Sequence, residues 1–216
     1  DALGNQTRSG QDISGNGALD LASQDRISET SAQYELIDSA WWYVTKSYVY
    51  ATGSNSTPTL VSESRRLVTG LTGNLAAKQV QIDIYGNVTT QTVTIDRDAK
   101  LVTTTTSSTI SDLEAVQVVR NGLLVSQSTL TISAPTLYQY DGLGRQIGVK
   151  QPWATAFATV TYDPSTGQVT GQTDAAGNAS TFTYYPQGSA GAGQVASATD
   201  PLGHTTRVAY DAMAHK

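Results

Sequence analysis

A short pattern, Asp-x-x-Gly followed by a polar residue, recurs from one end of the 216-residue chain to the other. An Asp at the first position of a turn can bind backbone amides with its carboxylate, and a Gly three residues later tolerates the positive φ that leads into a strand. The pattern therefore predicts strand reversals. Examples are Asp1 and Gly4, Asp83 and Gly86, Asp141 and Gly144, Asp174 and Gly177, and Asp200 and Gly203.

Between these turns polar residues alternate with Val, Ile, Thr and Tyr, as in residues 80–84, 101–106 and 181–184. A period of two is typical of half-buried strands, and β-branched residues disfavour a helix because their χ1 angles are restricted. Residues 23–36 offer the best alternative for a helix, but their apolar residues form no continuous stripe. We therefore expect an all-β fold of stacked β-hairpin repeats.

Tyrosines recur together with the turns. The spacing of the turn aspartates after Asp83 falls from 58 to 33 to 26 residues, and in the last two units a Tyr follows the Asp by ten residues. Because strand side chains alternate between faces, we expect Tyr184 and Tyr210 to share one face of the sheet in neighbouring units. The repeat tyrosines are Tyr140, Tyr162, Tyr184 and Tyr210.

Residues 140–145 read YDGLGR, with Arg145 directly after the turn Gly. A Tyr-Asp pair, then Gly-Arg or Gly-Asn, then a Thr-rich strand that ends in another Tyr resembles the Rhs/YD repeat. The match is regular over residues 136–216 and looser at residues 1–5 and 83–87. We therefore expect degenerate, wider-spaced β repeats in residues 1–135 and regular Rhs/YD repeats in residues 136–216, within one continuous sheet.

In the Rhs/YD family such repeats build a long β-sheet that spirals into a hollow shell. The shell encloses a C-terminal effector in bacterial Rhs and Tc-toxin-like proteins and forms part of an adhesion ectodomain in teneurins. The resemblance implies that this chain is part of a curved or spiral YD-type β-shell. It also implies that the whole protein is secreted or at the cell surface, and that its source is bacterial. The implied partners are neighbouring repeats of the same or an identical chain and an enclosed C-terminal effector domain.

The composition argues against several other functions. The chain has no Cys, so a disulfide, a thiolate metal site and a Cys nucleophile are excluded. A net charge of -5 without a basic stripe predicts no nucleic-acid partner, and no apolar run predicts membrane insertion by this segment. His204 stands where other turns have Asn or Arg, which predicts a variable exposed position. We expect no cofactor, no metal site and no catalytic residues.

The aromatic segment Trp41, Trp42 and Tyr43 is the most distinctive feature outside the repeats. On a strand, Trp41 and Tyr43 fall on one face, while Trp42 and Val44 fall on the other. Two apolar faces predict a strand covered on both sides. The alternative is that Trp41, Trp42 and Tyr43 are exposed and contact glycans.

Together these features predict a non-enzymatic structural segment that encloses or displays another domain of the same polypeptide. The alternative is an adhesin-like surface module that binds glycans through exposed aromatics. The chain begins and ends within turn-like segments, so we expect a fragment of a longer protein. Its terminal strands should then pair with a partner chain, and the isolated chain should self-associate.

Overall fold

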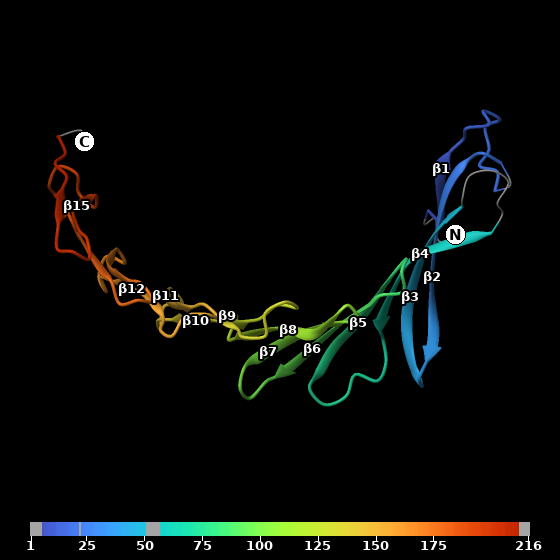
Figure 1. The fold of residues 1–216 in the computed structure, drawn as a ribbon, viewed down its shortest axis with the longest axis horizontal. Helices are drawn as coiled ribbons and strands as arrows, with labels where there is room; N and C mark the ends of the chain where they lie inside the picture. Colours follow the sequence, from blue (N-terminus) through green and yellow to red (C-terminus); the bar gives the residue numbers. More distant parts are fainter. Residues whose placement is uncertain (1–5, 22, 51–56, 212–216) are drawn as a thin grey trace. The chain divides into compact units, whose positions relative to one another are not determined.

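The computed structural model describes residues 6–21, 23–50 and 57–211. These residues form sixteen strands and no helix, so the all-β expectation is confirmed for this part of the chain. The strands belong to one antiparallel sheet whose order follows the chain from β1 to β16 (Figure 1). Because every strand lies beside its neighbour in the sequence, each connection is local. The turns at Asp1 and Gly4 lie outside the described residues.

Contacts divide the chain into two compact units. The first comprises residues 1–122 and 128–133, and the second comprises residues 123–127 and 134–216. These units are defined by the contacts between residues, whereas the sequence predicted a boundary between degenerate and regular repeats near residue 135. That boundary between repeat types stays a prediction.

Unit 1 contains the long strands. Seven of its eight strands run for 8–12 residues, and tight turns join several of them. Asp38 and Ser39 both have positive φ, 50° and 65°, as the two central residues of a type I′ hairpin turn do. The strands are β1 (Arg8–Gln11), β2 (Arg26–Ile37), β3 (Ala40–Tyr50), β4 (Pro58–Leu67), β5 (Leu75–Asp83), β6 (Val88–Asp96), β7 (Leu101–Ser108) and β8 (Ser111–Arg120).

Unit 2 contains short strands. All but the last run for five or six residues, and the last has three. They are β9 (Leu123–Gln127), β10 (Thr136–Tyr140), β11 (Gln146–Lys150), β12 (Ala158–Tyr162), β13 (Val169–Thr173), β14 (Ala179–Tyr184), β15 (Val195–Thr199) and β16 (Thr205–Arg207).

The apolar core of the described residues is small. Only Ile27, Trp42 and Val44 are buried apolar side chains, and Val44 is the most enclosed at 1% exposure. Most strand residues are half-buried on both faces, since no second sheet or helix covers them in the described part of the chain. Backbone pairing and cross-strand side-chain contacts therefore contribute much of the stability.

Candidate functional site

The Asp-x-x-Gly turns at Asp83, Asp141, Asp174 and Asp200 share one set of hydrogen bonds. At Asp83, the Gly86 N–H donates to the Asp83 carbonyl at 3.0 Å. The Asp83 Oδ1 atom accepts from the N–H groups of Tyr85 at 2.8 Å and Asn87 at 2.9 Å. The carboxylate thus satisfies amides that the reversing backbone leaves unpaired. The same bonds recur at Asp141, Asp174 and Asp200.

The turn glycines have the backbone conformation that the sequence predicts. Their φ angles are 81° at Gly86, 79° at Gly144, 92° at Gly177 and 87° at Gly203. Side chains with a Cβ rarely adopt this region, so each position favours glycine. All four lie between strands, as expected.

The residue after each turn Gly also contacts the carboxylate, which the sequence analysis missed. Its side-chain nitrogen lies next to the Asp Oδ2 atom, at 2.8 Å for Asn87, 2.7 Å for Arg145, 2.8 Å for Asn178 and 2.9 Å for His204. His204 is exposed as expected, and its Nδ1 atom contacts the Asp200 carboxylate. The shared signal is a side chain that can present an N–H group four residues after the Asp.

These hydrogen bonds favour the ionised form of each carboxyl group. The side chain at the fourth position after the Asp is the main cause that lowers the pKa of Asp83, Asp174 and Asp200. At Asp141, burial acts to raise the pKa, but the backbone and side-chain bonds from Arg145 outweigh it and the pKa is lowered. The ionised carboxylates therefore serve as hydrogen-bond acceptors within their own turns.

Asp163 forms a related turn that is one residue longer. The Gly167 N–H donates to the Asp163 carbonyl at 2.9 Å, and Oδ1 accepts from the Ser165 hydroxyl at 2.6 Å and the Thr166 N–H at 2.7 Å. The bond from the Ser165 hydroxyl is the largest of the effects that lower the pKa of Asp163 to about 2. The spacing Asp-x-x-x-Gly hid this turn from a search for Asp-x-x-Gly.

The Asp turns do not all mark the same point of the repeat. Asp141 joins β10 to β11 and Asp163 joins β12 to β13, whereas Asp174 joins β13 to β14 and Asp200 joins β15 to β16. Because successive strands are antiparallel, these two pairs of turns lie at opposite ends of the strands. The uneven spacing of the aspartates follows from this mixture of positions.

The tyrosines mark the repeat in phase. Tyr140, Tyr162 and Tyr184 lie 22 residues apart, from 140 to 162 to 184, and each is the last residue of its strand. At each of them the pairing with the next strand shifts by one residue. Such a β-bulge bends the strand and increases its local twist. Three successive hairpins thus share one construction, with the additional residue at Ile147, Thr170 and Ala196.

Two of these tyrosines bind the preceding hairpin. The Tyr162 hydroxyl donates to the carbonyl of Gln146 at 3.0 Å, and the Tyr184 hydroxyl donates to the carbonyl of Val169 at 2.7 Å. Gln146 and Val169 each open the second strand of the hairpin before. We call these two contacts the interhairpin tyrosine bonds, and they connect one repeat to the next.

Tyr210 does not continue this series in the described structure. It lies beyond β16, and its ring packs edge-on against Tyr185 with ring centroids 5.6 Å apart. The Tyr185 hydroxyl donates to the carbonyl of Val208 at 2.7 Å. Tyr184 lies within β14, so the two tyrosines expected to be equivalent have different surroundings. Their placement on one face of the sheet stays a prediction.

The aromatic segment of β3 divides between the two faces as expected. Trp42 is 9% and Val44 is 1% exposed, whereas Trp41 on the opposite face is 46% exposed. The expectation of a strand covered on both sides is therefore wrong, because nothing in the described residues covers the Trp41 face. Trp42 is also excluded from glycan contact by its burial, which leaves Trp41 and the half-buried Tyr43 as accessible aromatics.

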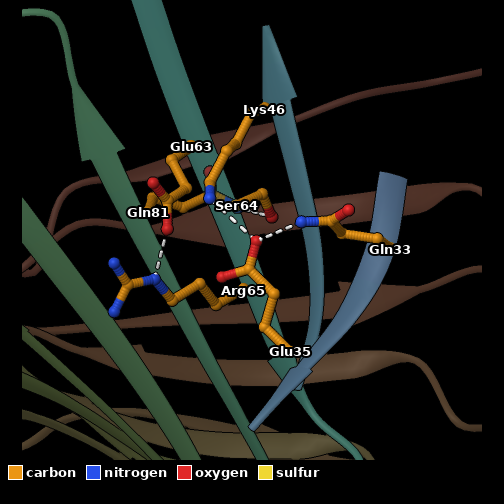
Figure 2. A network of polar contacts seen from close by, with 7 residues as sticks. All are labelled: Gln33, Glu35, Lys46, Glu63, Ser64, Arg65 and Gln81. Carbon is orange, nitrogen blue, oxygen red and sulfur yellow. Dashed lines mark hydrogen bonds and ion pairs between the residues drawn. The ribbon is translucent and has the colours of Figure 1, made fainter. Parts of the chain in front are cut away.

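Charged side chains accompany the buried face of unit 1 (Figure 2). The Glu35 carboxylate accepts from Lys46 Nζ at 2.8 Å and from Gln33 Nε2 at 2.7 Å, and Glu63 pairs with Arg65. Lys46 lies directly opposite Glu63 on the adjacent strand. Hydrogen bonds with Lys46 first, and with Gln33, lower the pKa of Glu35. Lys and Arg stems can shield apolar neighbours in this way while their charges stay paired.

Asp25 is a further structural carboxylate that the sequence analysis missed. It is 2% exposed, and it accepts hydrogen bonds from the backbone N–H groups of Ile13 at 2.8 Å, Ser14 at 3.0 Å and Asp20 at 2.9 Å. It thereby fixes the long connection between β1 and β2. No turn pattern in the sequence pointed to it, because its partners lie up to 12 residues away.

The described residues offer no grouping of acidic or His side chains that could hold a metal ion. In the same residues, no helix is present that could cross a membrane. Comparison of the sequence with protein-family models and with curated proteins finds no match. The candidate features are therefore defined by the geometry of each unit: capped turns in both, interhairpin tyrosine bonds in unit 2 and an exposed aromatic face in unit 1.

Proposed function

We propose that the chain is a non-enzymatic structural segment of an Rhs/YD-repeat protein, secreted or at the surface of a bacterial cell. Its sheet would enclose or display another domain of the same polypeptide. The observation that carries this proposal is the hairpin built three times in unit 2, with a bulge at Tyr140, Tyr162 and Tyr184. Repeat proteins gain stability from contacts between adjacent units, and the interhairpin tyrosine bonds are contacts of that kind.

Limited proteolysis of the natural polypeptide that contains residues 1–216 tests this proposal. An enclosed domain should resist cleavage while the sheet is intact and become accessible when Gly144→Ala and Gly177→Ala together strain two turns. Gly142→Ala is the matched control, because Gly142 lies in the same turn as Gly144 without positive φ. Equal cleavage of the second domain in all forms would favour display over enclosure. Turnover of a glycoside or peptide by residues 1–216 alone would overturn the structural proposal.

The edges of the sheet allow a second test. In the described residues, the outer edges of β1 and β16 pair with no further strand. The Val208 N–H donates to the Ala196 carbonyl, so by strand alternation the N–H of Arg207 points away from β15. We expect sedimentation to show self-association of the isolated chain that Arg207→Pro weakens, because proline removes this donor. A stable monomer with well-protected amides in residues 200–211 would contradict this expectation.

A second candidate function, glycan binding by a surface module, is favoured by different residues. Tyr34 and Leu36 on β2 are 62% and 61% exposed, and they lie beside Trp41 and Tyr43 on β3. Exposed aromatic groups of this kind often mark binding surfaces. Glycan-array binding that Trp41→Ala abolishes, with the β-sheet circular dichroism spectrum unchanged, would support this function.

A further inference from the structure

The exposed face of unit 1 has an ordered composition that the strand register reveals. Residues directly opposite one another on neighbouring strands point to the same face, so the register defines rows across the sheet. Three such rows lie on the face that carries Trp41. They are Leu36 and Trp41, then Tyr34, Tyr43, Arg66, Gln79 and Gln91, then Ala32, Thr45, Ser64, Gln81 and Thr89.

One end of this face is aromatic. The rings of Tyr34 and Tyr43 lie 5.3 Å apart at 59° to one another, and the Arg66 guanidinium lies 5.6 Å from the centre of the Tyr43 ring. Tyr43 is therefore held between its neighbours, while Tyr34 and Trp41 remain open to solvent. Aromatic rings with one free face stack well on the apolar faces of sugar rings.

The middle of this face carries one cation. Arg66 is exposed, and it forms no ion pair among the described residues. Its guanidinium group makes a cation–π contact with the Tyr43 ring. By contrast, Lys46 and Arg65 on the opposite face are both paired with carboxylates. The three rows contain no acidic residue. A planar guanidinium that is free of carboxylates is well suited to bind one from a ligand.

The other end of this face is neutral and polar. Gln79 and Gln91 lie opposite each other on β5 and β6, are exposed, and make no side-chain hydrogen bonds within the described residues. Neighbouring strands lie about 4.8 Å apart, so these amides continue the row of Tyr34, Tyr43 and Arg66 at regular intervals. Amide groups can both donate to and accept from hydroxyl groups, which is the hydrogen bonding that a sugar offers.

We propose that this face binds an acidic saccharide, a chain that contains uronic acid or another carboxylated sugar. Trp41 and Tyr34 stack on sugar rings, Arg66 pairs with the carboxylate, and Gln79 and Gln91 bind hydroxyl groups. This inference rests on the glycan-binding candidate and does not depend on an enclosing role for the sheet.

Calorimetric titration with polygalacturonate oligosaccharides, and with hyaluronan oligosaccharides, tests the inference. The matched ligand is polygalacturonate whose carboxyl groups have been reduced to alcohols. We expect binding of an acidic oligosaccharide to weaken at least about tenfold with Trp41→Ala and with Arg66→Gln, since central aromatic and Arg contacts dominate such interfaces. The matched controls are Trp153→Ala and Arg97→Gln, which change exposed residues elsewhere and should leave affinity unchanged.

The outcomes separate the two levels of the proposal. A difference between the two acidic oligosaccharides identifies the source of the ligand and supports the inference. Equal affinity for the reduced ligand, or no effect of Arg66→Gln, overturns the acidic specificity but leaves glycan binding intact. Absence of binding to any of these ligands by the folded chain overturns both. Self-association that depends on Trp41, without saccharide binding, would assign this face to a second copy of the chain.

Discussion

The two units of the chain build antiparallel sheet in different ways. Unit 1 uses strands of up to 12 residues and contains every buried apolar side chain among the described residues. Unit 2 uses strands of three to six residues, and it contains the Asp turns at Asp141, Asp163, Asp174 and Asp200 and all three bulges at tyrosines. Unit 1 therefore relies more on strand length and side-chain burial, whereas unit 2 relies more on its turns and on contacts between hairpins.

This difference predicts where each unit is sensitive to substitution. In unit 1, changes within strands should cost the most, because a few residues supply the burial. In unit 2, changes at turns should cost the most, because each short strand depends on its turn for register. The two units need not unfold together, so local stability is best followed by hydrogen exchange of each unit separately.

Trp42→Ala should have the largest effect and should act on unit 1. Loss of a large buried aromatic side chain destabilises proteins by about 3–5 kcal/mol. We expect a loss near the lower figure, because the sheet has a single layer in the described residues and can relax around the gap. The measurement is hydrogen exchange in β2 to β4.

Trp153→Ala is the matched control for this prediction. Trp153 is 76% exposed, so its removal should change stability by no more than about 0.5 kcal/mol. If both substitutions lowered stability equally, side-chain burial in unit 1 would not be the source of the difference between the units.

Gly144→Ala should have the next largest effect and should act on unit 2. Gly144 has a φ of 79°, and an Ala in the left-handed region costs about 1–2 kcal/mol. Faster exchange of the amides in β10 and β11 would report this loss.

Gly142 lies two residues earlier in the same turn, and a Cβ there would meet no atom within 4 Å. Gly142→Ala should therefore be neutral or slightly stabilising, since it lowers the entropy of the unfolded chain. If both substitutions cost the same, turn conformation would not be the source of stability in unit 2.

A double-mutant cycle compares the two cation–π contacts, one in each unit. The Arg145 guanidinium lies 4.4 Å from the centre of the Tyr162 ring in unit 2, and that of Arg66 lies 5.6 Å from Tyr43 in unit 1. We expect coupling of about 0.5–1 kcal/mol between Arg145→Ala and Tyr162→Leu, because the contact is short and half-buried. The coupling of Arg66→Ala with Tyr43→Leu should be smaller. A larger coupling in unit 1 than in unit 2 would contradict the expectation that the cation–π contact contributes more in unit 2.

The sequence predicted the strands and the capped turns because both depend on residues close together in the chain. Alternation of Val, Thr and Tyr specifies a strand locally, and an Asp and a Gly three residues apart specify a turn, as at Asp174 and Gly177. Burial was harder to predict. Trp41 and Trp42 are adjacent and chemically identical, and only the side chains that neighbouring strands supply decide which one is covered.

The phase of the repeat was also not evident from the turn motif. Asp141 and Asp174 have the same local sequence pattern, yet they lie at opposite ends of their strands because an antiparallel hairpin array needs a turn at each end. The tyrosine spacing of 22 residues carries the phase, but its meaning depends on hydrogen bonds between hairpins, such as that from Tyr162 to Gln146. Contacts between repeats are set by three-dimensional packing and leave only a weak trace in one sequence.

The smallest expected effects concern the titration of the turn carboxylates in the two units. The pKa of Asp163 is lowered to about 2, first by the Ser165 hydroxyl, and the pKa of Asp83 is lowered first by the Asn87 side chain. A carboxyl group with a lowered folded-state pKa stabilises the fold above its unfolded-state pKa. For Asp163 this contribution is lost as the pH falls through the range from about 4 toward about 2.

Ser165→Ala and Asn87→Ala should each raise the pKa of the adjacent carboxyl group, because each removes a hydrogen bond to the charged form. Carbon-13 NMR titration of the Asp side chains measures both shifts in one sample series. Each substitution should leave the pKa of the other aspartate unchanged, since the two turns lie in different units and share no partner.

If neither pKa moves, the lowered pKa values would come from the backbone amides alone, and the side chains of Ser165 and Asn87 would not stabilise the charged form. If only that of Asp163 moves, the longer turn of unit 2 would depend on its side-chain hydroxyl more than the turn of unit 1 depends on its amide. Such a result would sharpen the contrast between a unit stabilised by its turns and a unit stabilised by its strands.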